Sequence, residues 1–102
     1  MTSVYSKNNV LIRLTDERWI HIVENHDDLA GRVLEVLETV AEPDIIVKGV
    51  KSELLAVRKI IDKWLVVVYK EISKQDGFII TAFITSRIAY LLKKEIIWKK
   101  QS

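Results

Sequence analysis

Two histidines on one predicted helix are the side chains of this chain best suited to acid–base chemistry. His21 and His26 are its only histidines, and it has no cysteine. Imidazole is the one side chain that titrates near neutral pH without help, so each histidine is a candidate acid, base or metal ligand. They stand five residues apart, which turns them to different faces of a continuous helix and argues against a shared metal ion. We therefore expect a site that needs no metal and no other cofactor.

A dispersed set of polar residues could complete a site for RNA cleavage. The 2′-hydroxyl of RNA supplies the nucleophile, so the protein must only move protons and stabilise the charge on the phosphorane. A histidine can move the protons, and Arg and Lys side chains suit the charge. The candidate catalytic residues are His26, Arg58, Lys70 and Thr85, and the candidate substrate-binding residues are Thr81, Ser86 and Arg87.

Each candidate also has an ordinary structural interpretation. A histidine at a helix end often caps it, and an arginine in an apolar run can extend its stem to the edge of a sheet. A lysine at the end of a strand commonly protects an edge, and threonine is a good strand former. The three tryptophans are predicted to lie in the core or to line a groove. The chain has no glycine-rich phosphate loop, no HExxH zinc motif and no GxSxG nucleophile elbow, so no familiar enzyme motif decides between these interpretations.

Acidic residues concentrate in the first half of the chain and basic residues in the second. Residues 16–44 carry nine Asp and Glu side chains against two Arg, and Lys and Arg dominate from residue 48 to the end. The net charge of the whole chain is only +2. A basic second half could offer a face that binds phosphate, and a solvated surface of ordinary lysines would explain the same charges.

The length of 102 residues predicts one domain. Residues 1–8 are expected to form a flexible N-terminal arm, and residues 9–102 the domain itself. The N-terminus lacks the apolar core of a signal peptide, and the longest apolar run, residues 64–69, is too short to cross a bilayer. Together with the absence of cysteine, these features predict a cytoplasmic protein without a membrane partner.

The pattern of apolar residues predicts helices first and strands after them. Residues 9–14 are typical of a strand, and Thr15 of the N-cap of a helix that runs to residue 25. Asp27 or Asp28 is expected to cap a second helix, which Pro43 ends. Four strands are predicted at residues 44–48, 54–61, 64–70 and 78–85, although the second of these could also be a short helix.

Two cues connect and end this run of strands. Asp76-Gly77 lies between the last two predicted strands and is a strong hairpin signal. After Ser86, apolar residues at helical spacing predict a short helix before the tail. Helices followed by strands favour an α+β domain with an antiparallel sheet.

Five segments, in order, resemble the phage-type branch of the barnase/EndoU/colicin/RelE-like nuclease family, whose fold is abbreviated BECR. These segments are RLTDERWIHIVENH, VLETVAEPDIIVKG, WLVVVYKE, GFIITAFITSRI and KEIIW, and the resemblance covers residues 10–98. It implies an α+β fold in which two N-terminal helices pack on a curved antiparallel sheet of about four strands. It also implies that the family's histidine, mid-sheet arginine, strand-end lysine and last-strand threonine correspond to His26, Arg58, Lys70 and Thr85.

The activity implied by this resemblance is metal-independent endoribonuclease, with 2′,3′-cyclic phosphate product ends. Such a phage-derived nuclease or toxin would have RNA as its substrate and a protein inhibitor, an antitoxin, as a further partner, and a homo-oligomer stays open. Three departures matter, because Asn25 and Asp27 flank the histidine where the family usually has Arg and Pro, and Phe83 stands where a Tyr is common. They leave a second interpretation open, a catalytically degenerate relative that binds RNA or protein, and a third, a structural domain of a larger assembly.

Overall fold

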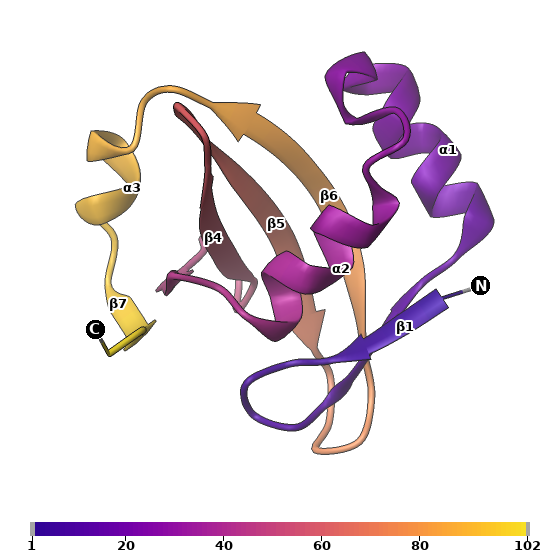
Figure 1. Ribbon diagram of the computed structural model, residues 1–102. Helices are drawn as coiled ribbons and strands as arrows, with labels where there is room; N and C mark the ends of the chain where they lie inside the picture. Colours follow the sequence, from indigo (N-terminus) through magenta and orange to yellow (C-terminus); the bar gives the residue numbers. More distant parts are fainter. Residues whose placement is uncertain (1, 102) are drawn as a thin grey trace.

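The computed structural model describes residues 2–101, which form one seven-stranded sheet and three short helices (Figure 1). The strands are β1 (Thr2–Tyr5), β2 (Leu11–Leu14), β3 (Ile45–Lys48), β4 (Leu54–Ile60), β5 (Lys63–Glu71), β6 (Gly77–Thr85) and β7 (Ile96–Lys99). The helices are α1 (Asp16–Asn25), α2 (Val33–Ala41) and α3 (Ala89–Leu92), with a 3₁₀ turn, η1, at Asp27–Leu29.

The strands follow the order β1-β2-β6-β5-β4-β3-β7 across the sheet. Every neighbouring pair is antiparallel except β2 and β6, which run parallel. That parallel pairing lasts for two positions only, where Ile12 faces Gly77 and Arg13 faces Phe78. α1 and η1 also contact β6, and the ring of His26, between them, meets Phe83 beyond the paired positions. The second half of β6 is therefore an edge that a helix end can reach.

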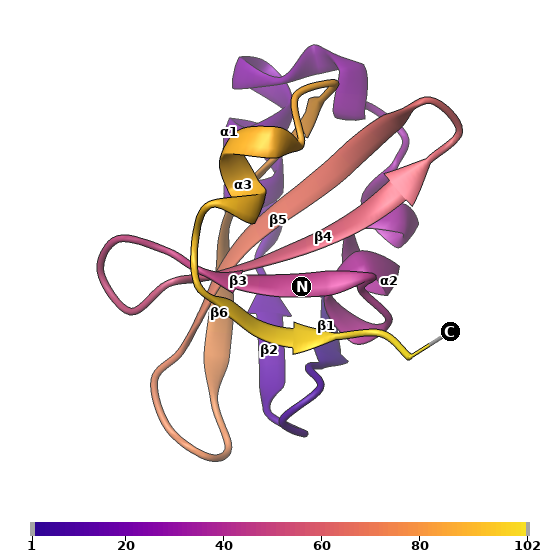
Figure 2. The same ribbon diagram turned by 90° about the vertical axis from the view of Figure 1, so that its left-hand side faces the viewer.

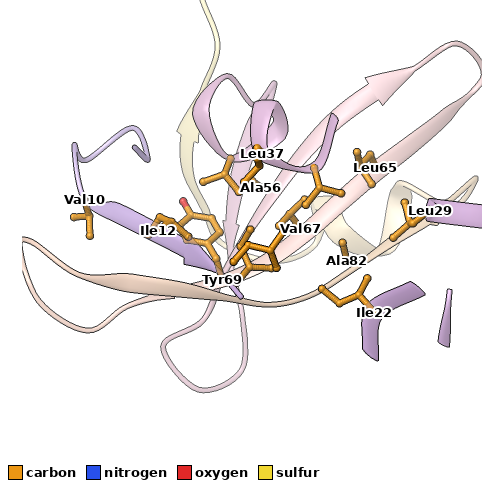
Figure 3. Close-up of a cluster of buried hydrophobic side chains, with 14 residues drawn as sticks. Val10, Ile12, Ile22, Leu29, Leu37, Ala56, Leu65, Val67, Tyr69 and Ala82 are labelled. Carbon is orange, nitrogen blue, oxygen red and sulfur yellow. The ribbon is translucent and has the colours of Figure 1, made fainter. Parts of the chain in front are cut away.

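Strand β5 shows how the sheet buries both of its faces. Successive side chains of a strand point to opposite faces. On β5, Leu65, Val67 and Tyr69 join the core beneath α1 and α2, which Figure 3 shows. Trp64, Val66 and Val68 join a second cluster, which contains Leu91 of α3. We call these two sides of the sheet the α2 face and the α3 face.

The sheet curls around α2, which lies inside the curve of the strands (Figure 1). The contacts of Lys7, in the loop after β1, show this directly. Its Nζ lies 3.0 Å from Oε2 of Glu42, at the end of α2, and 5.1 Å from the centroid of the Trp98 ring in β7. Strands β1 and β7 stand at opposite ends of the strand order, so the two edges of the sheet approach each other across the end of α2.

The predicted arrangement of two N-terminal helices on a sheet of about four strands is wrong. The structure has seven strands in its sheet and a third helix, α3, whose Leu91 packs on the face opposite to α1 and α2. The extra strands are short. Residues 2–5 form β1 where a flexible arm was expected, because a turn with Asn9 at φ 63° folds them back onto β2. Asn tolerates this left-handed conformation better than most residues do.

The helical segments also differ from the prediction in one place. Thr15 does cap α1, since its Oγ1 accepts a hydrogen bond from the backbone N–H of Arg18 at 3.1 Å. The second predicted helix is broken, however, into η1 and α2. Gly31 adopts φ 77° between them, a conformation that interrupts a helix and suits glycine. The tail after α3 forms β7, which pairs with β3.

Candidate functional site

His26 stands at the junction of α1 and η1, beside the free edge of β6. Its backbone N–H donates to the carbonyl of Ile22 at 2.8 Å and closes α1, and its own carbonyl accepts from Leu29 at 3.0 Å. The imidazole is half-buried and lies against the ring of Phe83, with centroids 6.3 Å apart and planes tilted by 37°. His21, by contrast, is exposed on α1 and lies 3.7 Å from a carboxylate oxygen of Glu24. Of the two histidines, His26 is the one whose ring contacts a side chain of the sheet among residues 2–101.

Two threonines flank Phe83 on the same face of β6. Thr81, Phe83 and Thr85 alternate along the strand and stand opposite Val68, Val66 and Trp64 of β5, so all three point to the α3 face. Oγ1 of Thr85 accepts a hydrogen bond from the backbone N–H of Arg87 at 3.0 Å. This bond turns the chain at the end of β6 and leaves Ser86 and Arg87 exposed. The structure thus places the His26 ring against Phe83, the residue that stands between Thr81 and Thr85 along β6.

Lys70 shares the α3 face but lies at its opposite end. It stands opposite Phe78, whereas Thr85 stands opposite Trp64. Trp64 and Lys70 are six positions apart on an extended strand, a distance of about 20 Å. Lys70 is therefore not beside His26 and Thr85.

Arg58 points to the α2 face. It stands opposite Leu65, which belongs to the core beneath the helices, and its Nη1 lies 3.3 Å from Oε2 of Glu38 on α2. The thickness of the sheet separates it from Thr85. The four candidate catalytic residues accordingly do not converge on one point. Arg58 lies on the α2 face, whereas Lys70 and Thr85 lie on the α3 face.

The far end of the α3 face carries a bidentate ion pair. Nε and Nη2 of Arg13 donate to the two carboxylate oxygens of Asp76 at 2.7 and 2.9 Å. The hydrogen bond from Arg13 is the main cause that lowers the pKa of Asp76, and the bond to Asp76 is the main cause that raises the pKa of Arg13. The pair ties the loop between β5 and β6 to β2, and so fixes the end of the sheet rather than supplying a free cation.

A cavity that the sequence analysis missed opens on the α3 face beside Thr85. Its volume is about 480 Å³, and its lining residues are Asp44, Ile45, Trp64, Ile88, Leu92, Lys99 and Lys100. Nζ of Lys59 lies 5.8 Å from the centroid of the Trp64 ring. Figure 2 views this side of the molecule, with α3 in front of the strands. The cavity was not predicted because β7 was not predicted. The pairing of β7 with β3 brings Lys99 and Lys100 to the cavity.

No protein-family model, curated protein or solved structure matches this chain. Among residues 2–101, no group of three or more His, Asp or Glu side chains is arranged to hold a metal ion. The helices within this part of the chain are too short or too polar to cross a membrane.

Proposed function

We propose that this protein is a metal-independent endoribonuclease whose reaction takes place on the α3 face. The observation that carries the proposal is the contact of the His26 ring with Phe83, which stands between Thr81 and Thr85 along β6. One imidazole that substrate can reach is sufficient for the proton transfers of RNA cleavage, because the substrate brings its own nucleophile. The order of the five sequence segments that resemble a nuclease family is the second support.

His26 would take the proton of the 2′-hydroxyl as that oxygen attacks the neighbouring phosphorus. The bond from phosphorus to the 5′-oxygen then breaks, and the leaving oxygen receives a proton from a protonated imidazole or from water. The products carry a 2′,3′-cyclic phosphate and a free 5′-hydroxyl. A half-buried ring suits this work, since contact with Phe83 fixes its position while part of it stays open to substrate.

Thr85 would hold a non-bridging phosphate oxygen. Its Oγ1 already accepts from the N–H of Arg87, which leaves its own hydroxyl hydrogen free to donate to phosphate. Arg87 is exposed immediately after this turn and would supply the positive charge that the phosphorane needs. Arg58 takes no part in this proposal, because the register of β4 with β5 places it on the α2 face, where it lies beside Glu38.

The charge of the C-terminal segment supports RNA as the substrate. Residues 86–101 contain Arg87, Lys93, Lys94, Lys99 and Lys100 against Glu95 alone, a net charge of +4. α3 and β7 bring this segment to the α3 face. We further propose the cytoplasm as its place of action and, if the protein is a toxin, a protein inhibitor as its partner.

The test is incubation of purified protein with mixed RNA in EDTA, followed by chemical mapping of the cut ends. We expect cyclic phosphate ends with wild type, and a loss of about 100-fold or more with His26→Ala, the usual scale for removing a general acid or base. His21→Ala is the matched control, because His21 lies on the same helix but is exposed and away from Phe83. Cleavage that His26→Ala leaves unchanged, or that EDTA abolishes, would contradict the proposal.

A second candidate function is an RNA-binding module without catalysis. Two observations favour it, namely the pairing of Arg58 with Glu38 and the phenyl ring of Phe83 where the resembled family commonly has a hydroxyl. This function predicts intact RNA at high protein concentration together with binding that weakens as salt rises, because phosphate contacts release counterions.

A further inference from the structure

The cavity beside Trp64 is lined by apolar and charged side chains that the proposed cleavage does not use. Its walls are the apolar side chains of Ile45, Ile88 and Leu92 and the indole of Trp64, and charged residues stand among its lining. Sites for small organic groups are commonly cavities of roughly 300–1,000 Å³ with apolar walls and a few polar groups. At about 480 Å³ this cavity lies within that range.

The charges around the cavity are mainly positive. Lys99 and Lys100 belong to its lining, and the ammonium group of Lys59 lies against the indole ring. Among the described residues that line the cavity, Asp44 is the one acidic group, and its Oδ2 accepts from the backbone N–H of Lys59 at 2.7 Å. A ligand with a flat apolar body and an anionic group complements this lining, since the body can stack on the indole and the anion can meet the lysines.

The cavity also adjoins the groups proposed to act on RNA. Trp64 stands directly opposite Thr85 in the pairing of β5 with β6. Residues opposite each other in an antiparallel pair have Cα atoms about 4.5–5.5 Å apart. A nucleotide whose phosphate is held by Thr85 would therefore have the base of a neighbouring nucleotide within reach of the indole.

We propose that this cavity binds one base of single-stranded RNA, stacked on Trp64, with the adjoining phosphates held by Lys59, Lys99 and Lys100. The inference rests on the proposed function for the identity of its ligand. It adds that the enzyme takes single-stranded RNA, because a base inside a duplex cannot enter a cavity in the protein. Asp44 would accept a hydrogen bond from an N–H group of the base and orient it.

The experiment uses an RNA oligonucleotide of about eight nucleotides, within the usual site size for single strands, with 2′-O-methyl groups that prevent cleavage. Tryptophan fluorescence is followed with wild type, Trp64→Phe and Trp98→Phe, and the affinity of every variant, Trp64→Ala included, is measured by the fluorescence anisotropy of an end-labelled copy of the oligonucleotide. We expect quenching with wild type and Trp98→Phe, and none with Trp64→Phe. Trp64→Ala should weaken binding by about tenfold, the scale of one lost stacking contact. Equal affinity of wild type and Trp64→Ala would overturn the proposal.

Two further measurements keep the test independent of any change in folding at Trp64. Leu92 is half-exposed at the cavity, so Leu92→Glu places a negative charge there without emptying the core. It should weaken binding, whereas Leu34→Glu, at an exposed position of α2, should not. Lys99→Ala and Lys100→Ala should each reduce the slope of log K against log salt by about 0.7. Effects of Leu34→Glu equal to those of Leu92→Glu would count against the cavity.

The two proposals fail in different ways. Binding that depends on Trp64, without cleavage of ordinary RNA, would contradict the nuclease proposal and support the base-binding cavity. Cleavage that depends on His26, with an RNA affinity that substitution of Trp64 and Leu92 leaves unchanged, would contradict the base-binding cavity and support the nuclease proposal. A dimer that Leu92→Glu dissociates, without RNA affinity, would show that a second copy fills the cavity and would overturn the proposal.

Discussion

Tyr69 carries a polar group whose burial costs stability. Its side chain is fully buried, and its hydroxyl has no hydrogen-bond partner within residues 2–101. Burial is the main cause that raises the pKa of this hydroxyl, and the charge of Glu71 adds to it. A buried donor without a partner costs free energy that a phenyl ring of nearly the same shape avoids.

We therefore predict that Tyr69→Phe increases the free energy of unfolding by about 1 kcal/mol. Chemical denaturation measures the change, and Tyr5→Phe is the matched control, because Tyr5 is largely exposed and should show no effect. A Tyr69→Phe variant less stable than wild type would mean that the hydroxyl makes a net favourable interaction.

The ion pair of Arg13 and Asp76 predicts a dependence of stability on pH. The folded state lowers the pKa of Asp76 from its ordinary value of 3.8, chiefly through the hydrogen bond from Arg13. A carboxylate with a lowered pKa stabilises the fold above its ordinary value, and this stabilisation is lost as the pH falls through the folded-state value. The contribution is modest, because both side chains are more than one third exposed.

Asp76→Asn should accordingly lower the unfolding temperature at pH 7, and the difference from wild type should shrink below pH 3.8. Thermal unfolding between neutral pH and the acid limit of the fold measures this. Asp62→Asn, at an exposed position between β4 and β5, is the control. A difference from wild type that is the same at every pH would exclude the ion pair as its cause.

At the scale of the elements, the turn between β4 and β5 is strained. Ile60 pairs with Lys63, so the turn consists of Ile61 and Asp62 alone. Ile61 adopts φ 47° and is almost fully exposed. A β-branched residue at positive φ is an outlier, and such strain costs on the order of 1–3 kcal/mol. Its side chain gains nothing from burial in return.

Ile61→Gly should raise the free energy of unfolding by about 1 kcal/mol. Glycine relieves the strain in the folded state, and its larger backbone entropy in the unfolded state offsets part of this gain. Ile72→Gly is the matched control, because Ile72 is also exposed but does not have a positive φ. We expect that control to lose stability or to stay unchanged, and a loss of stability with Ile61→Gly would contradict the account.

The elements that the sequence predicted are those with strong local signals. β5 and β6 follow from two apolar runs around Asp76-Gly77, and the start of α1 follows from Thr15. β7 could not be predicted, because residues 88, 92 and 96 have helical spacing and only pairing with β3, far away in the sequence, makes a strand of residues 96–99. Partners distant in sequence decide such short edge strands.

At the scale of the whole molecule, the candidate site residues lie on two opposite faces of the sheet. His26 could be selected from the sequence because histidine has its own chemistry, but the face of Arg58 depends on the register of β4 with β5. A shift of one residue would have turned Arg58 toward the α3 face. The same register carries Trp64 beside Thr85, which no local pattern indicated. The central claim is therefore that the α3 face performs the chemistry and the α2 face supports the fold.

The most direct test compares the cleavage rate of single-stranded RNA, in EDTA, for wild type, His26→Ala and Arg58→Ala. We predict that His26→Ala loses about 100-fold or more, and that Arg58→Ala, which breaks the exposed contact with Glu38, stays within a few-fold of wild type. Circular dichroism confirms that each variant is folded. A large loss with Arg58→Ala beside a small one with His26→Ala would place the chemistry on the α2 face and contradict the account.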